Sequence, residues 1–171
     1  DALLRLPSIS CTQADLDQSN LPVVELLASW LNDLGFECRI LPIANQPGKA
    51  NLLASFGSGP GGLVMAGHTD TVPCNPERWQ HNPFALTEAN NRWYGLGSCD
   101  MKGFFPLIIE AVRSYLNQPF KHPLIILATA DEESSMSGAR ALVAADFSQA
   151  RHAIIGEPTG MRTIRLHKGI M

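Results

Sequence analysis

The sequence predicts an α/β fold in which a mostly parallel sheet carries helices on both faces. Three short runs are almost wholly apolar, as expected of strands covered on both faces, and they span residues 63–66, 124–130 and 153–155. Longer segments that are typical of helices follow the first two runs, at residues 101–116 and 137–145. Parallel strands need long crossover connections, so this alternation of strands and helices favours a parallel sheet.

The first predicted helix spans residues 20–34, because their apolar side chains recur at helical spacing along one face. Asn20 can cap its N-terminus, Pro22 is tolerated in its first turn, and Gly35 is expected to end it. Pro106 is expected near the first turn of the next predicted helix, or at a kink within it.

Weaker patterns complete the layout. Residues 36–41 and 51–56 are predicted strands, and the glycine-rich residues 57–62 are a predicted turn. Residues 71–93 contain several prolines and form a long irregular connection, which inside a compact domain is usually functional. A further strand is expected to begin over residues 163–167.

The composition is that of an ordinary globular domain. The chain has 171 residues, of which 45% are hydrophobic and 17% charged, which suits one domain with its own core. Its net charge of -3 argues against nucleic acid as a partner, and no apolar run is long enough to span a membrane. The four cysteines show no C-x-x-C spacing, so we expect free thiols and a location in the cytoplasm.

Acidic side chains and one histidine follow the apolar runs. These residues are His68 and Asp70 after the first run, Glu132 and Glu133 after the second, Glu157 after the third, and Asp100 at the end of a glycine-rich turn. Ligands of an open α/β sheet bind outside the carboxyl ends of its strands, so these side chains are expected at one edge. Carboxylates gathered there repel one another unless cations or protons hold them. One histidine with several carboxylates is the ligand set of a hydrolytic metal centre.

Each of these residues alone has a simpler interpretation. His68 with Asp70 can be a pair at a surface turn, and Asp100 can cap a helix. The three adjacent acids at 131–133 can be solvated or favoured by a helix dipole, and Glu157 can be a plain turn residue. Their joint occurrence at one predicted sheet edge favours a functional site.

The residue types also suggest roles. Asp70 is interpreted as orienting His68, because a metal-bound histidine usually donates its other ring N–H to a carboxylate or carbonyl. Asp100 can bridge two cations. Of the adjacent Glu132 and Glu133, one can bind metal while the other acts as general base, and the residues alone leave open which does which.

The glycine-rich residues 57–62 do not fit a nucleotide-binding loop. The segment after them is strand-like rather than helical, and Pro60 interrupts the glycines. A dinucleotide-binding oxidoreductase is therefore rejected.

Four segments together resemble one family of enzymes. They are residues 67–73 (GHTDTVP), 94–103 (YGLGSCDMKG), 128–133 (ATADEE) and 155–159 (IGEPT). The chain is similar to the co-catalytic zinc metallohydrolases of the acetylornithine deacetylase and succinyl-diaminopimelate desuccinylase family. The residues after the acidic cluster favour the deacetylase branch, since Ser134 stands where desuccinylases typically have glycine.

The resemblance implies a zinc-peptidase-like catalytic domain with two zinc ions, for which cobalt or manganese can substitute. It assigns four metal ligands: His68 and Glu157 on one zinc, Glu133 on the other, and Asp100 between both. It also assigns Asp70 to the orientation of His68, and Glu132 to the role of general base and acid.

The activity implied is the hydrolysis of N2-acetyl-L-ornithine to L-ornithine and acetate, a step in arginine biosynthesis. The alternatives within the family are a succinyl-diaminopimelate desuccinylase and a dipeptidase. An alternative of another class is a truncated paralogue that binds a metal or a partner without turnover. The resemblance further implies a small N-acyl amino acid as substrate, no nucleic-acid or membrane partner, and a homodimer for the full-length protein.

The resemblance also implies an incomplete domain. Residues 1–161 correspond to the N-terminal part of the dizinc catalytic domain, and residues 162–171 to the start of a lid or dimerisation domain. The family's last zinc ligand, a late histidine, has no counterpart here. We therefore expect the chain alone to bind one divalent ion through His68, Asp100 and Glu157, with little or no deacetylase activity.

Overall fold

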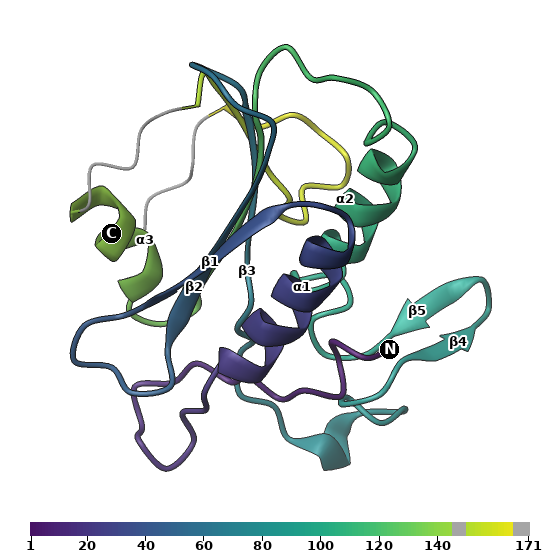
Figure 1. Cartoon of the computed structure of the whole chain (residues 1–171). Helices are drawn as coiled ribbons and strands as arrows, with labels where there is room; N and C mark the ends of the chain where they lie inside the picture. Colours follow the sequence, from purple (N-terminus) through teal and green to yellow (C-terminus); the bar gives the residue numbers. More distant parts are fainter. Residues whose placement is uncertain (145–149, 166–171) are drawn as a thin grey trace.

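The computed structural model describes residues 1–144 and 150–165, and within them a five-stranded sheet forms the centre of the molecule (Figure 1). Its strands lie in the order β1-β2-β6-β3-β7. In chain order the elements are α1 (Leu21–Asp33), β1 (Glu37–Pro42), β2 (Ala50–Phe56), β3 (Leu63–His68), the 3-10 turn η1 (Pro76–Arg78), β4 (Thr87–Ala89), β5 (Arg92–Tyr94), α2 (Phe104–Arg113), β6 (Leu124–Thr129), α3 (Ser137–Ala144) and β7 (His152–Ile155).

The sheet is mixed, with its parallel part at β6, β3 and β7. Strand β3 runs parallel to both β6 and β7, whereas β2 pairs antiparallel with β1 and with β6. The expected parallel arrangement therefore holds for the strands that precede the candidate site residues. The antiparallel β1–β2 pair follows from its connection, because residues 43–49 are too few for a crossover helix.

Helices cover both faces of the sheet, as the sequence predicts. Figure 1 shows α1 and α2 on one side and α3 on the other. Side chains of β6 alternate between the two cores: Ile126 packs with α1 and α2, whereas Ile125 and Leu127 pack with Leu142 of α3. No described helix is long and apolar enough to cross a membrane.

The ends of α1 follow the predicted signals except at Asn20. Pro22 lies in the first turn, and Gly35 follows the helix with a left-handed φ of +87°. The Asn20 side chain makes no cap, and the prediction that it would was wrong. Its amide is buried and instead donates to the carbonyl of Ala50 and to Thr69 Oγ1, at 2.8 and 2.7 Å. These bonds join the start of α1 to the strands beneath the site.

The connection over residues 71–93 contains structure that the sequence analysis missed. Strands β4 and β5 form a hairpin whose turn residues, Asn90 and Asn91, have φ values of +52° and +56°. Two left-handed residues in succession make the turn that matches the twist of a two-stranded hairpin. The Asn-Asn pair between short alternating runs was the available signal.

The C-terminal predictions need two corrections. Strand β7 was expected to be buried, but Ile154 and Ile155 are 50% and 64% exposed, because β7 lies at the sheet edge. Residues 163–165 have no regular structure, and the rest of the strand expected over 163–167 lies outside the described residues. Helix α2 begins at Phe104 rather than at residue 101, and Pro106 falls in its first turn, as predicted.

We predict that Ile126→Ala lowers the free energy of unfolding by about 2–5 kcal/mol, because it leaves a cavity between the sheet and two helices. The matched control is Ile154→Ala, on an exposed edge strand of the same sheet, with an expected loss below about 1 kcal/mol. Urea denaturation followed by circular dichroism measures both. Equal losses would contradict the described position of the core.

Candidate metal centre

The residues singled out in the sequence converge at the carboxyl edge of the parallel strands. His68 ends β3, Glu132 and Glu133 follow β6, Glu157 follows β7, and Asp100 precedes α2. The Nε2 atom of His68 lies 3.1 Å from Asp100 Oδ1 and 3.9 Å from both Glu132 Oε2 and Glu157 Oε1. One buried imidazole is thus surrounded by carboxylates from three other segments.

Two sets of potential ligand atoms share His68. In the first set, one ligand atom each from His68, Asp100 and Glu157 lies within 4.8 Å of the others, and in the second the same holds for His68, Glu132 and Glu133. The first set is the one expected to hold a single divalent ion. In the second set Glu133 is grouped with Glu132 and His68, whereas the resemblance groups Glu133 with Asp100.

Asp70 connects the histidine to the adjacent glutamates. Its carboxylate is fully buried and accepts backbone N–H groups from Glu132, at 3.1 Å, and from Glu133, at 3.0 Å. The Nδ1 atom of His68 lies 3.0 Å from the Asp70 carbonyl and 3.5 Å from its carboxylate. Because a carbonyl oxygen only accepts, Nδ1 carries the hydrogen and Nε2 faces the acidic cluster.

The pKa values of these groups reflect the concentration of negative charge. Burial alone would lower the pKa of His68, but its bond to the Asp70 carboxylate and the charges of Asp70, Glu132 and Glu157 outweigh burial and raise it to about 9. Burial opposes ionisation of Asp70, yet the same bond and the two N–H groups keep its pKa below the usual value. Burial and the charge of Asp100 raise the pKa of Glu133.

A cation fits this arrangement. A neutral imidazole presents the Nε2 lone pair to carboxylate oxygens, and two acceptors that face each other repel unless positive charge lies between them. A proton on His68 can supply that charge, as its raised pKa indicates. One nitrogen and several carboxylate oxygens are also a suitable ligand set for zinc, cobalt or manganese.

Lys102 anchors the turn that presents Asp100 to the N-terminal segment. Its Nζ atom is buried and donates to the carbonyl of Leu6 at 3.0 Å and to Ser8 Oγ at 3.3 Å, and burial lowers the pKa of Lys102 to about 8. The residue at the N-cap of α2 is Gly103, so the simpler interpretation of Asp100 as a helix cap was wrong. The Asp100 side chain is instead half-exposed at the site.

Buried polar side chains beneath the site were missed by the sequence analysis. Asn51 accepts from the backbone N–H of Ala130 at 3.0 Å and donates to the carbonyl of Gly138 at 2.9 Å, so it spans both ends of the loop that carries the glutamates. A Cβ on Gly138 would lie 2.4 Å from Asn51 Oδ1, so only glycine allows this approach. The available signal was two polar residues, Lys49 and Asn51, on either side of Ala50, the first residue of a mainly apolar strand.

The four cysteines are free thiols, as predicted. Cys99 is exposed, and it belongs to neither set of potential ligands in the described part of the chain.

Comparison with known protein families assigns the chain to one of them. The family model described as Peptidase family M20/M25/M40 matches residues 64–168, more than half of the sequence. The chain belongs to this peptidase family. The matched stretch includes His68, Asp100, Glu132, Glu133 and Glu157, so the family assignment covers the whole acidic cluster.

The similar members of the M20/M25/M40 family include two acetylornithine deacetylases. That of Proteus mirabilis (strain HI4320) is 54% identical over 98% of this chain, and that of Salmonella arizonae is 53% identical over 98%. These matches cover 43% and 44% of the relatives, so the chain spans less than half of their length.

Two solved peptidase structures share the fold. Human carnosine dipeptidase 1 superposes with a TM-score of 0.77 at 24% identity, covering 90% of this chain and 36% of that one. The metallo-carboxypeptidase Sso-CP2 from Sulfolobus solfataricus gives a TM-score of 0.72 at 22% identity, covering 91% of this chain and 35% of that one. These likenesses support the described mixed sheet and its helices.

The raised pKa of His68 predicts how the stability of the metal-free protein depends on pH. The imidazole gains its stabilising interactions when protonated, so the contribution is complete below its ordinary pKa of 6.5 and is lost as pH rises through about 9. With a chelator present to remove metal, the free energy of unfolding should fall as the pH rises from about 6.5 to about 9. The fall should be up to ~3 kcal/mol larger in the wild type than in His68→Gln.

Urea denaturation at several pH values measures this difference. The control is His122→Gln, which changes an exposed imidazole and should keep the wild-type slope. An unchanged slope in His68→Gln would contradict the described environment of His68.

Proposed function

We propose that this protein is a metal-dependent amide hydrolase that removes the acetyl group from N2-acetyl-L-ornithine. The observation that carries the proposal is the cluster of one imidazole and four carboxylates at the sheet edge, in a chain 54% identical to an acetylornithine deacetylase. Metal ions held by such a cluster would acidify a water molecule and polarise the amide carbonyl.

The metal ligands proposed are the four residues that the resemblance implies. His68 and Glu157 would hold one zinc ion, Glu133 the other, and Asp100 both. The distances between His68 and the oxygens of Asp100 and Glu157 support the first of these sites. Cobalt or manganese would suit the same nitrogen and oxygen ligands.

Glu132 is proposed as the general base and acid. Its carboxylate is about one-third exposed, so it can reach a bound substrate, while its backbone N–H is held by Asp70. It would take a proton from the attacking water and deliver it to the leaving amine nitrogen. Asp70 would keep His68 in the orientation and tautomer that leave Nε2 available.

The organisation of the whole protein is also a proposal. Residues 1–161 would belong to the catalytic domain and residues 162–171 would begin a lid or dimerisation domain. The complete protein is further proposed to be a homodimer in the cytoplasm that acts on a small N-acyl amino acid, and the names of the similar deacetylases support the substrate.

An assay of the enzyme expressed from its complete gene tests the activity. We expect zinc-dependent release of acetate from N2-acetyl-L-ornithine, with slower turnover of N-succinyl-diaminopimelate and of dipeptides. Faster turnover of either competitor would reassign the substrate, and no turnover of any of the three with metal present would contradict the proposal.

Two substitutions should separate metal binding from proton transfer. Glu132→Gln is expected to lower kcat by about 10²–10⁴-fold while metal content stays unchanged, because an amide cannot accept the proton. Asp100→Asn is expected to lower metal content, since it removes a charged ligand beside His68.

Metal analysis of the dialysed proteins and steady-state kinetics measure these effects. Glu110→Gln, on the exposed face of α2, is the matched control and should change neither quantity. Wild-type turnover in Glu132→Gln would exclude it as the general base.

A further inference from the structure

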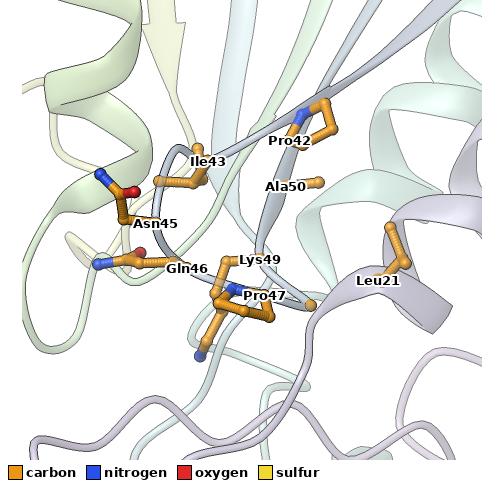
Figure 2. Close-up of a pocket in the computed structure, with 9 residues that line it drawn as sticks. Leu21, Pro42, Ile43, Asn45, Gln46, Pro47, Lys49 and Ala50 are labelled. Carbon is orange, nitrogen blue, oxygen red and sulfur yellow. The ribbon is translucent and has the colours of Figure 1, made fainter.

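Lys49 is a buried cation beneath the acidic cluster that the proposed reaction does not use. It lies in the loop between β1 and β2, directly before β2, and Figure 2 shows it beside Gln46 and Pro47. Its side chain is 5% exposed. Its Nζ atom forms ion pairs with Asp131 Oδ1 at 2.7 Å and with Asp17 Oδ1 at 2.8 Å, and of the two only the contact with Asp17 also has hydrogen-bond geometry.

Asp131 is the residue that turns the chain from β6 toward the general base. Its φ of +56° lies in the left-handed region, which is uncommon for a residue with a side chain, although aspartate enters it more readily than most residues. Its other carboxylate oxygen accepts from Ser137 Oγ at 2.9 Å, and its carbonyl accepts from the Met136 N–H at 2.6 Å. Asp131 is thus the centre of the loop at 131–137.

The turn at Asp131 determines where the next two residues lie. It directs the N–H groups of Glu132 and Glu133 to the two oxygens of Asp70. Burying a carboxylate without a compensating cation costs free energy, and the neutral hydroxyl of Ser137 does not balance its charge, so loss of a paired cation should weaken the hold on Asp131 in this turn. Among the described residues, Lys49 is the cation paired with Asp131.

We infer that Lys49 is a positioning residue of this centre: its ammonium group holds Asp131 in the left-handed turn and thereby fixes Glu132 and Glu133 against Asp70. The inference rests on the proposed function only for its effect on catalysis. Burial lowers the pKa of Lys49, but the contacts with Asp131 and Asp17 outweigh burial and raise it, which is consistent with a permanent charge.

A purely structural role is the alternative, because Lys49 also contacts Asp17. That residue lies in the N-terminal segment and accepts from the Cys11 N–H at 3.0 Å, far along the chain from the glutamates. The two partners of Lys49 therefore provide a matched comparison. Loss of Asp17 should disturb the N-terminal segment, whereas loss of the ammonium group should also release the turn at Asp131.

Amide hydrogen exchange in the protein expressed from its complete gene, measured by NMR, tests the inference without any activity assay. The quantity compared is the exchange ratio, defined as the exchange rate of the Glu132 and Glu133 amides divided by that of the Ile126 amide of β6. This division corrects for any global loss of stability. In Lys49→Met the exchange ratio should rise on the order of tenfold. Lys49→Arg should restore most of the protection, because it restores the charge. Asp17→Asn should leave the ratio at its wild-type value.

The inference is overturned if the exchange ratio in Lys49→Met equals that of the wild type, or if Asp17→Asn raises the ratio as much as Lys49→Met does. Both outcomes are decided without substrate, so they do not depend on the proposed function.

A kinetic comparison then tests the consequence for catalysis, with enzyme expressed from its complete gene. If the wild type hydrolyses N2-acetyl-L-ornithine, Lys49→Met should lower kcat by about tenfold to a hundredfold with KM nearly unchanged, because a general base is displaced. A wild-type kcat in Lys49→Met would overturn the positioning role. An inactive wild type together with the expected exchange ratios would contradict the proposed function and leave the positioning role supported.

Discussion

The arrangement of the site depends on one buried carboxylate, that of Asp70. Its two oxygens accept the backbone N–H groups of Glu132 and Glu133, while the same residue bonds Nδ1 of His68. These contacts join the ends of β3 and β6, two parallel neighbours of the sheet. A single residue thereby sets the tautomer of the histidine through its backbone carbonyl and the location of both glutamates through its carboxylate.

The distribution of charge explains why the open side of the site suits a cation. Beneath the cluster, Lys49 pairs with Asp131, and Lys102 lies buried under the turn that presents Asp100. On the open side, the Nε2 atom of His68 faces the carboxylates of Asp100, Glu132 and Glu157. Protonation of His68 and binding of a divalent ion are thus alternative ways to balance the same charge.

Patterns within short stretches of sequence predicted the strands that depend on their own apolar residues. Apolar runs marked β3, β6 and β7, and the polar residues directly after them proved to share one edge because parallel strands end together. The role of Asn20 was mispredicted, because the signal for a helix cap is local whereas its actual partners, Ala50 and Thr69, are distant in sequence. The pairing of Lys49 with Asp131 was missed for the same reason.

Other differences have equally physical causes. The exposure of β7 depends on its place at the sheet edge, which the apolar sequence of a strand does not specify. The separate roles proposed for Glu132 and Glu133 came from the family resemblance, since two adjacent and identical side chains give no basis in sequence for telling them apart. In the structure both N–H groups bond Asp70, but the two side chains differ in their surroundings: Glu132 Oε2 lies 3.9 Å from His68 Nε2, whereas burial and the charge of Asp100 raise the pKa of Glu133.

Anomalous diffraction at the zinc edge, from crystals soaked in zinc, would test the central claim most directly. The account predicts an ion about 2.0–2.1 Å from Nε2 of His68, with oxygens of Asp100 and Glu157 completing its protein ligands. An ion bound elsewhere, for instance at the exposed Cys99, or no ion at the acidic cluster at saturating zinc, would contradict it.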